Sequence, residues 1–451
     1  MDVSELRNRK VSVIGAARSG VAVAKLLQAE GAQVFVSDKQ HPEKLKAEAQ
    51  SLSQAGIACE LGEHTNRVYD CSLIVISPGV PSNAPVVVEA RTRGIKIVSE
   101  VEVASWFCRS PIVAVTGTNG KTTTTTLIGR ILSDAKKKHA VAGNIGTAFS
   151  SVVLELAAAD IAVLEISSFQ LDHCETFRPR IAAILNITQN HMDRYGNSME
   201  QYAAAKARIF MNQTADDVLI YDADDEWTSR VVRQARCTLM PFSIKRMLDE
   251  GAFVEYGKLV TVITGKRDEI IDVDQISIKG PHNLYNAMAS TLAGHLMGVG
   301  TASIRATLKN FKGVEHRQEF VREVNGVRYY NDSKATSVDA VWYALQAFDQ
   351  PIVLMLGGRD KGNDYSKIFD LVRLRVRAIV AMGESADKVE KAFSGFISVK
   401  RATSIDEAVL TAQSLAQPGD VVLLSPACAS FDWFENFEQR GKVFKELVKN
   451  L

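Results

Sequence analysis

The residues best suited to chemistry lie in the segment Gly-Thr-Asn-Gly-Lys-Thr-Thr at residues 117–123, directly after an apolar run. Glycines let the backbone approach a ligand, and the N–H groups at a helix start attract anions. Lys121 can reach the outer phosphates of a nucleotide, and the hydroxyl of Thr122 or Thr123 can contact Mg²⁺. The full Walker spacing is absent, because Val115 stands where its first glycine would be. The segment predicts a phosphate-binding loop; the alternative is an ordinary strand-to-helix turn with a solvated lysine.

Two further apolar runs end in polar groups. Glu165 closes the run Ile-Ala-Val-Leu-Glu, and His191 follows Ile-Ala-Ala-Ile-Leu-Asn-Ile-Thr. The carboxyl ends of parallel strands share one edge of a sheet, so we expect both residues to lie near the phosphate loop. A carboxylate at Glu165 suits Mg²⁺. The alternatives are a capping or ion-paired carboxylate at Glu165 and a hydrogen-bonded structural histidine at His191.

The elements that must position these residues are short apolar runs that alternate with longer helical patterns. Most of these runs, such as Ile-Val-Ala-Val and Ile-Val-Leu-Met-Leu, are continuously apolar, which is typical of parallel strands covered by helices on both faces. The predicted fold class is therefore α/β with mostly parallel sheets. We place the domains at residues 1–99, 100–312 and 313–451, and expect a small antiparallel lobe within residues 241–278.

Composition excludes several classes of protein. The hydrophobic fraction of 46%, the charged fraction of 23% and the net charge of +1 indicate a globular protein without a nucleic-acid or membrane partner. No apolar signal core or membrane-length segment occurs, so a cytoplasmic protein is expected. The six cysteines are scattered without a Cys-x-x-Cys pair, which favours reduced thiols over disulfides or zinc.

The N-terminal region imitates a dinucleotide-binding fingerprint. Gly15 and Gly20 flank its turn, and Asp38 ends the next apolar run, but Ala17 replaces the middle glycine. That glycine normally allows close approach to a pyrophosphate, so an NAD-dependent oxidoreductase is disfavoured. Another alternative is that the turn only packs a strand on a helix.

A series of short blocks resembles the Mur ligases of peptidoglycan synthesis. In chain order they are GTNGKTT, GNIG, EISSFQL, NHMDRY, AAKARIF, GPHNLYNAMA, EHRQE, NDSKATS, LGGRDKG and LLSPACASFDWFENFEQRG. The resemblance implies Rossmann-like N-terminal and C-terminal domains that flank a central P-loop ATPase-type domain. The block NDSKAT and the last block are most similar to the branch of the family that adds D-glutamate.

The resemblance also implies a reaction. ATP would phosphorylate the carboxylate of UDP-N-acetylmuramoyl-L-alanine, and the amine of D-glutamate would attack the acyl phosphate through a tetrahedral intermediate, giving ADP and phosphate. Phosphorylation supplies a leaving group, and Mg²⁺, with two ions expected, offsets the negative charge. The alternative steps add L-alanine, a diamino acid or D-Ala-D-Ala. A nucleotide-dependent switch is a further alternative, although Glu165, His191 and Lys334 exceed what binding requires. The resemblance implies a cytoplasmic monomer acting on small molecules.

The resemblance assigns residues to each ligand. Lys121, Glu165, His191 and Lys206 are expected to be catalytic, with Thr122, Glu165, His191 and a carbamylated Lys206 as metal ligands. The residues expected to bind ATP are Gly117, Thr118, Asn119, Gly120, Lys121, Thr122, Thr123, Asn283, Arg317, Asp332 and Lys334. The UDP substrate is assigned to Arg18, Ser19, Asp38, Gly79 and Asn144, and D-glutamate to Thr336, Lys361, Ser430 and Phe437.

Several of these assignments have plain structural alternatives. Asn283 could cap a helix, Phe437 could pack in a core, and Lys206 could be a solvated helix residue. Arg317, Lys334 and Lys361 could be ordinary surface charges.

Overall fold

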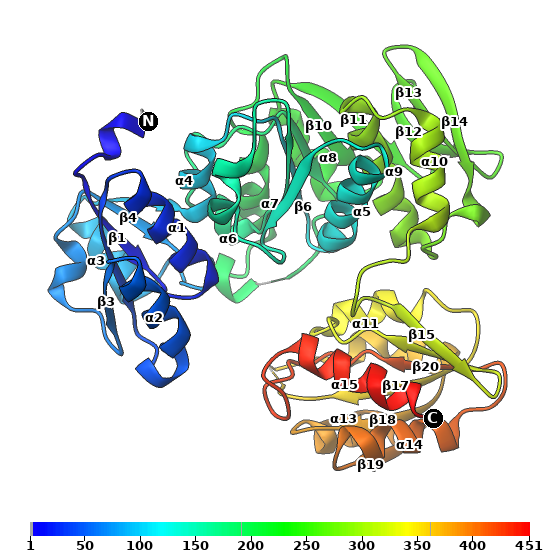
Figure 1. Ribbon diagram of the computed structural model, residues 1–451. Coiled ribbons are helices and arrows are strands. Elements are labelled where there is room, and N and C mark those ends of the chain that lie inside the picture. The colour runs from blue at the N-terminus through cyan, green and yellow to red at the C-terminus, as the bar shows by residue number, and fades with distance from the viewer. Residues whose placement is uncertain (1–2, 191, 361) are drawn as a thin grey trace. The chain divides into compact units, whose positions relative to one another are not determined.

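The computed structural model describes residues 3–190, 192–360 and 362–451 (Figure 1). The chain divides into two compact units, Met1–Gln275 with Tyr285–Lys309, and Ile276–Leu284 with Asn310–Leu451. Within the described residues, no helix has the length and apolar character needed to cross a membrane. The predicted domain boundaries at residues 99 and 312 remain predictions.

The first sheet is parallel throughout, with helices on both faces. Its strands, in spatial order, are β3 (Ala58–Leu61), β2 (Gln33–Asp38), β1 (Lys10–Ile14), β4 (Leu73–Ile76) and β5 (Lys96–Ser99). Its helices are α1 (Arg18–Ala29), α2 (Lys46–Gln54), α3 (Pro85–Thr92) and α4 (Glu100–Phe107). Val34 and Val36 face the core that includes α1, whereas Phe35 faces the core that includes α3. Because successive side chains alternate between two buried faces, the middle of β2 is continuously apolar.

The second sheet carries the phosphate loop. Its strands, in spatial order, are β14 (Lys266–Asp272), β13 (Lys258–Ile263), β12 (Gly251–Glu255), β11 (Thr238–Ser243), β10 (Val218–Asp222), β9 (Ile181–Ile184), β6 (Ile112–Thr116), β8 (Ile161–Glu165) and β7 (His139–Gly143). Its helices are α5 (Lys121–Asp134), α6 (Ser168–Leu171), α7 (Met199–Ala207), α8 (Glu226–Val231), α9 (Pro281–Leu296) and α10 (Thr301–Asn310). Strands β6 to β12 are mutually parallel, while β13 and β14 are antiparallel to their neighbours.

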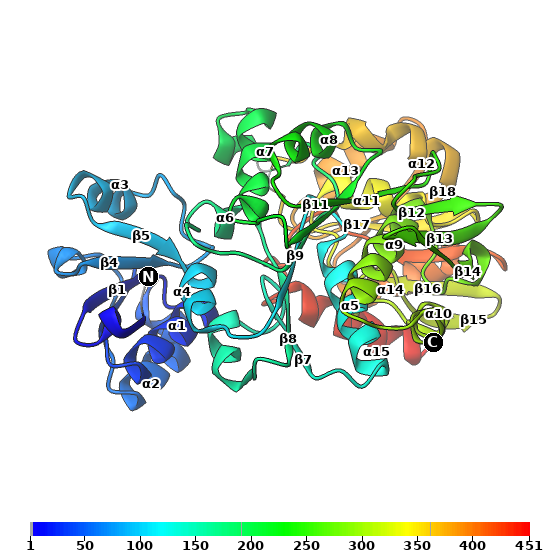
Figure 2. The same cartoon turned by 90° about the horizontal axis from the view of Figure 1, so that it is seen from above.

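The expected antiparallel lobe is therefore an extension of this same sheet. Strand β11 pairs in parallel with β10, and β12 to β14 continue from it as a meander (Figure 2). Their more polar sequence reflects exposure at the sheet edge, since the first four residues of the edge strand β14 are exposed or half-buried and only Ile270 and Ile271 are buried.

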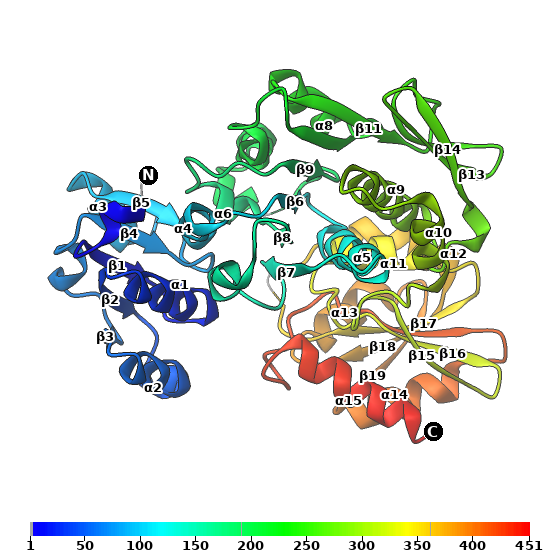
Figure 3. The same ribbon diagram turned by 45° about the horizontal axis from the view of Figure 1, so that its top comes forward.

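The third sheet lies wholly in the second unit. Its strands, in spatial order, are β15 (Glu319–Val324), β16 (Val327–Asn331), β20 (Val421–Leu424), β17 (Ile352–Gly357), β18 (Val376–Met382) and β19 (Ser398–Ala402). Its helices are α11 (Val338–Leu345), α12 (Phe369–Arg375), α13 (Ala386–Phe393), α14 (Ile405–Leu415) and α15 (Phe437–Lys449). Helices α14 and α15 pack side by side on one face (Figure 3), and α11 to α13 contribute to the core on the other. Only β15 is antiparallel to its neighbour, so the predicted α/β class with mostly parallel sheets is confirmed.

Helix α4 joins the first sheet to the second through two buried carboxylates. The Glu102 carboxylate accepts hydrogen bonds from the backbone N–H groups of Glu175, Thr176 and Phe177 at 2.8–3.1 Å and from the Trp106 indole at 3.1 Å. One oxygen of Glu100 accepts from the N–H of Ser150 at 2.7 Å. Glu102 therefore fixes the segment that leads into β9.

Glu102→Leu is expected to destabilise the protein by about 3 kcal/mol, because the buried N–H of Phe177 and the partly buried N–H groups of Glu175 and Thr176 would all lose their acceptor. The denaturation midpoint followed by circular dichroism measures this. Glu89→Leu serves as the matched control, since the Glu89 side chain is 45% exposed and forms an ion pair with Arg93 one helical turn away. Equal shifts for the two variants would show that Glu102 has no such role.

Candidate active site

The predicted phosphate loop lies between β6, which ends at Thr116, and α5, which begins at Lys121. Gly117 and Gly120 both adopt positive φ, at 151° and 82°. A Cβ atom at Gly120 would lie 2.3 Å from Oδ1 of Asn286 on α9. A side chain at this position is therefore excluded both by backbone strain and by lack of space.

The segment after β9 holds the loop in shape. The N–H of Thr118 donates to the carbonyl of Asn186, and the N–H of Asn119 donates to Asn186 Oδ1, both at 2.9 Å. The N–H of Thr188 donates to the Thr118 hydroxyl at 3.0 Å. The N–H groups of Thr118 and Asn119 are therefore used in hydrogen bonds within the protein. The N–H groups at the start of α5 are the ones placed to bind an anion. Sequence analysis missed Asn186, although a polar residue directly after an apolar run was the available signal.

Two lysines converge on one carbonyl oxygen of this loop. Lys121 Nζ donates to the carbonyls of Gly117 and Thr118 at 2.9 and 2.8 Å, and Lys206 Nζ donates to the same Gly117 oxygen at 2.8 Å. Lys206 is only 1% exposed, and its amine lies over the Tyr202 ring. The solvated alternative for Lys206 is therefore wrong. Burial, reinforced by the charge of Lys121, lowers the pKa of the Lys206 amine well below its usual range.

Glu165 lies beside this loop because β8 pairs in register with β6, opposite Val115. Its side chain is 2% exposed, and Oε1 accepts from the Asn144 amide at 2.8 Å. Its Oε2 is buried and has no hydrogen-bond partner among the described residues. A buried, unpartnered anionic oxygen is costly unless a cation binds it. Neither capping nor ion pairing accounts for Glu165, and its free oxygen fits Mg²⁺.

Two pairs of these residues are in contact: Lys121 with Lys206 through the Gly117 carbonyl, and Glu165 with Asn144. Their roles remain predictions. Thr122 lies in the first turn of α5 and is 5% exposed. His191, which was expected to complete this group, lies outside the described residues.

The turn of the first domain is built like the phosphate loop. Gly15 has φ of 97°, and a Cβ atom at Gly20 would lie 1.8 Å from the Gly15 carbonyl. Asp38 Oδ2 accepts from the N–H of Ala16 at 2.7 Å, so this carboxylate shapes the turn. Arg18 is exposed where α1 begins.

The other residues assigned to the UDP substrate are less constrained. Ser19 is half-buried in the first turn of α1. Gly79 has open space where a Cβ would stand, so packing does not require glycine there.

The second unit holds the remaining predicted contacts. Asp332, directly after β16, is 1% exposed; Oδ2 accepts from the Ser425 hydroxyl at 2.8 Å and Oδ1 from the N–H of Gln318 at 3.2 Å. Burial raises the pKa of Asp332 to about 6, and the nearby positive charge of Arg317 opposes this. Asn283 lies inside α9 and donates its amide to the carbonyl of Lys279 at 2.8 Å, so the helix-capping alternative is wrong.

A buried arginine that sequence analysis did not single out ties the ligand loops of this unit together. Arg440 on α15 donates to the carbonyl of Ser333 at 2.8 Å, to its hydroxyl at 2.9 Å and to the carbonyl of Cys428 at 3.1 Å. Burial lowers the pKa of the Arg440 guanidinium to about 10. The loops after β16 and β20 are thereby held as one surface.

Three of the expected D-glutamate residues, Thr336, Ser430 and Phe437, belong to these loops or to α15. Thr336 is exposed, Ser430 is 2% exposed, and Phe437 is half-buried at the start of α15. The Lys334 amine lies 5.6 Å from the Phe437 ring centroid. Lys361 lies outside the described residues.

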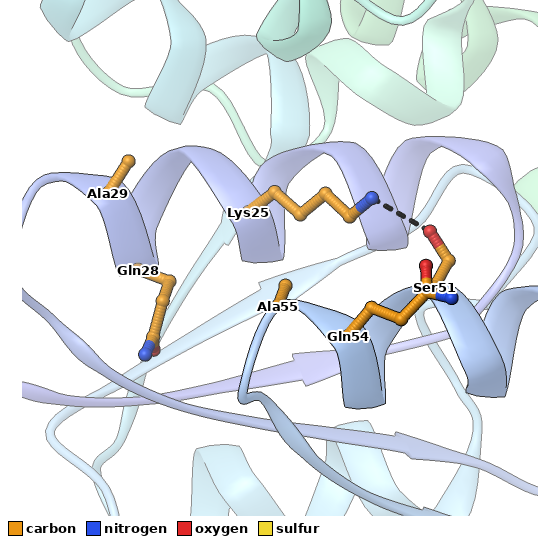
Figure 4. A pocket seen from close by; sticks show the side chains of 6 residues that line it. All are labelled: Lys25, Gln28, Ala29, Ser51, Gln54 and Ala55. Carbon is orange, nitrogen blue, oxygen red and sulfur yellow. Dashed lines mark hydrogen bonds between the residues drawn. The ribbon is translucent and has the colours of Figure 1, made fainter.

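Two other features carry no part of the site. A hollow of about 430 Å³ lies between α1 and α2, where Lys25 donates to the Ser51 hydroxyl at 2.7 Å (Figure 4).

Glu315, His316 and Glu319 lie close enough to hold a metal, but Lys445 already donates to both carboxylates at 2.6 and 2.9 Å.

Gly120→Ala is expected to weaken the binding of a fluorescent ATP analogue at least about tenfold, because the new methyl group would displace Asn286 or the loop. Gly300→Ala is the matched control, since a Cβ atom there meets nothing within 4 Å. Unchanged affinity of Gly120→Ala in a titration would exclude this loop as the nucleotide site.

Comparison with known protein families gives three matches along the chain. Residues 9–99 match a MurD-like N-terminal domain of Mur ligases, residues 115–294 the Mur ligase middle domain, and residues 316–428 the Mur ligase glutamate ligase domain.

Full-length relatives agree with these matches. The chain is 48% identical to the UDP-N-acetylmuramoylalanine–D-glutamate ligase of Chloroherpeton thalassium and 47% identical to that of Salinibacter ruber, with 100% of each chain covered. Its fold resembles that of UDP-N-acetylmuramate-alanine ligase MurC from Thermotoga maritima, with a TM-score of 0.62, 20% identity, and 98% and 99% of the two chains covered. The family predicted from the motifs is confirmed: the chain belongs to the Mur ligase family.

Proposed function

We propose that this chain is an ATP-dependent ligase that joins D-glutamate to UDP-N-acetylmuramoyl-L-alanine and releases ADP and phosphate. The observation that carries the proposal is 44–48% identity over nearly the whole chain to relatives that bear this activity in their names. The N-terminal match to a MurD-like domain disfavours the dehydrogenase alternative. The converging lysines and buried carboxylate exceed what a nucleotide switch would need.

In the first half-reaction, a carboxylate oxygen of the substrate attacks the γ-phosphorus of ATP. The bond from phosphorus to the bridging oxygen breaks, ADP leaves, and an acyl phosphate forms. Lys121, at the start of α5, supplies positive charge to the phosphates at the end where the helix dipole also favours anions. Asn144, held by Glu165, stands beside the metal carboxylate and would orient the reacting carboxyl group.

Mg²⁺, when bound, neutralises charge on the phosphates and supports the transfer. Glu165, through its unpartnered Oε2, and Thr122, through its hydroxyl, would hold the ion, with His191 as a further ligand. For a second ion we propose a carbamate at Lys206. The uncharged amine, favoured by burial, would attack the carbon of CO₂ and release a proton, turning a cation into an anion.

In the second half-reaction, the amine of D-glutamate attacks the acyl carbon, and phosphate leaves from the tetrahedral intermediate. Thr336, Lys361, Ser430 and Phe437 would bind D-glutamate, with Lys361 paired to a carboxylate. Asn283, Arg317, Asp332 and Lys334 would contact the nucleotide. Arg18, Ser19, Asp38 and Gly79 would hold the uridine diphosphate. We further propose a cytoplasmic monomer, because all substrates are small charged molecules.

An assay with radiolabelled D-glutamate tests the function. We expect labelled product and ADP only when ATP, Mg²⁺, UDP-N-acetylmuramoyl-L-alanine and D-glutamate are all present. L-alanine, a diamino acid and D-Ala-D-Ala should not replace D-glutamate. Equal ATP hydrolysis without the two substrates, and no ligated product, would overturn the proposal.

The pH dependence of kcat/KM for ATP tests Asp332. Because burial raises its pKa to about 6, its carboxylate should be lost below pH 6, and kcat/KM should fall about tenfold per pH unit there. The native state holds this proton more tightly than the unfolded chain does, so protonation stabilises the fold as pH falls through 6. The loss of activity should therefore not be accompanied by a lower Tm from this group. Asp332→Asn, with lower activity, should lack this acid limb; an unchanged acid limb would exclude Asp332.

A further inference from the structure

The segment between β4 and α3 lies against the glycine turn of the first domain. The Ser77 hydroxyl donates to the carbonyl of Gly15 at 3.1 Å. A Cβ atom at Gly15 would lie 2.8 Å from Ser77 Cβ and 3.3 Å from Val80 Cγ2. This segment, residues 77–84, is therefore in contact with the turn that we assign to the uridine diphosphate.

An arginine of the central domain reaches across to this segment. Arg194, in the short helix Met192–Tyr195 after β9, donates from Nη2 to the carbonyl of Val80 at 2.9 Å. Its guanidinium carbon lies 3.8 Å from the ring centroid of Phe169. Phe169 belongs to α6, which begins three residues after Glu165. Arg194 is thus packed on the helix that follows the metal carboxylate while it holds the first domain's segment.

A second contact lies two residues further along the segment. The Ser82 hydroxyl and His173 Nε2 are 3.1 Å apart, and the N–H of Ser99 donates to the carbonyl of His173 at 2.9 Å. His173 is 6% exposed, and burial lowers its pKa to about 4, so the ring is neutral near pH 7. The segment is therefore fastened to the central domain at Val80 and again at Ser82.

We propose that Arg194, assisted by His173, is a positioning residue that clasps residues 77–84 to the central domain and so holds the uridine end of the substrate in register with its reacting carboxyl group. This inference rests on the proposed function, since it takes the first-domain turn as the uridine diphosphate site. Binding energy from the uridine end can assist the reaction at the other end only if the two binding regions are mechanically linked. The clasp supplies that link.

The test combines enzyme variants with a shortened substrate. Arg194→Ala, Arg194→Lys and Ser82→Ala are compared with wild type on UDP-N-acetylmuramoyl-L-alanine and on N-acetylmuramoyl-L-alanine, which lacks the uridine diphosphate. Arg93→Ala is the matched control, because Arg93 follows the last residue of α3 and its contacts lie within the first domain: it pairs with Glu89, donates to Asn66 Oδ1 at 3.3 Å and lies over the Tyr69 ring. The readouts are kcat and KM for each substrate, together with Tm.

On the complete substrate, Arg194→Ala should lower kcat/KM about tenfold, with KM for ATP and for D-glutamate unchanged. On the shortened substrate the same variant should lose less than about twofold, because there is no uridine end to position. Arg194→Lys, which retains a donor, should recover part of the lost kcat/KM. Ser82→Ala should lower kcat/KM less than Arg194→Ala does, and again more on the complete substrate than on the shortened one. Arg93→Ala should match wild type.

An equal loss on both substrates would show that Arg194 acts on the chemistry or the fold, and no loss on the complete substrate would show that the clasp does nothing; either result overturns the proposal. If Arg194→Ala lowers Tm strongly, Ser82→Ala decides the question, because it removes only one hydroxyl. A wild-type enzyme that forms no product from the complete substrate would instead refute the proposed function, and the clasp with it.

Discussion

Two lysine amines donate to a single carbonyl oxygen in the loop before α5, and the rest of the central site is arranged around that close approach. Lys121 and Lys206 both donate to Gly117, where the helix start adds further positive potential. Burial, and after it the charge of Lys121, lowers the pKa of Lys206, and Glu165, whose Oε2 has no partner among the described residues, lies on the adjacent strand β8. In the proposed function, a polyphosphate would bring negative charge to the lysines and its divalent cation would bring positive charge to Glu165.

In each of the three sheets, hydrogen bonds to a polar side chain fix the conformation of a loop. A loop at the carboxyl end of a strand is pinned by a polar side chain from a neighbouring element. Asp38 accepts from the N–H of Ala16 in the first sheet, and Asn186 accepts from the N–H of Asn119 in the second. In the third, Arg440 donates to the carbonyls of Ser333 and Cys428. Pinning removes conformational freedom from the loop before any ligand arrives, which lowers the entropic cost of binding.

The sequence made some of this predictable and some not, for a physical reason. The phosphate loop is a local pattern of strand, glycine turn and helix, so its limits at Thr116 and Lys121 could be read directly. Glu165 could be found because strand ends share an edge. The partner of Asn119 lies 67 residues away, the lysine at Gly117 lies 89 residues away, and Arg440 is 107 residues from Ser333. Contacts at such separation depend on the register of the whole sheet, so the spacing of motifs could not predict them. Lys206 was assigned through the family resemblance, and Asn186 and Arg440 were given no role.

Because each ligand loop is pinned from within its own sheet, a domain carries the shape of its loop with it. Exchange of one domain between members of this family would therefore transfer a loop that already has its binding conformation, without changes elsewhere in the chain. The exception is residues 77–84, whose carbonyl at Val80 is held by Arg194 from the next domain. The same segment meets the central domain a second time, where the Ser82 hydroxyl lies 3.1 Å from His173 Nε2. A chimaera joined between these two domains would therefore keep both contacts only if its central domain supplied Arg194 and His173 and its first domain supplied Ser82.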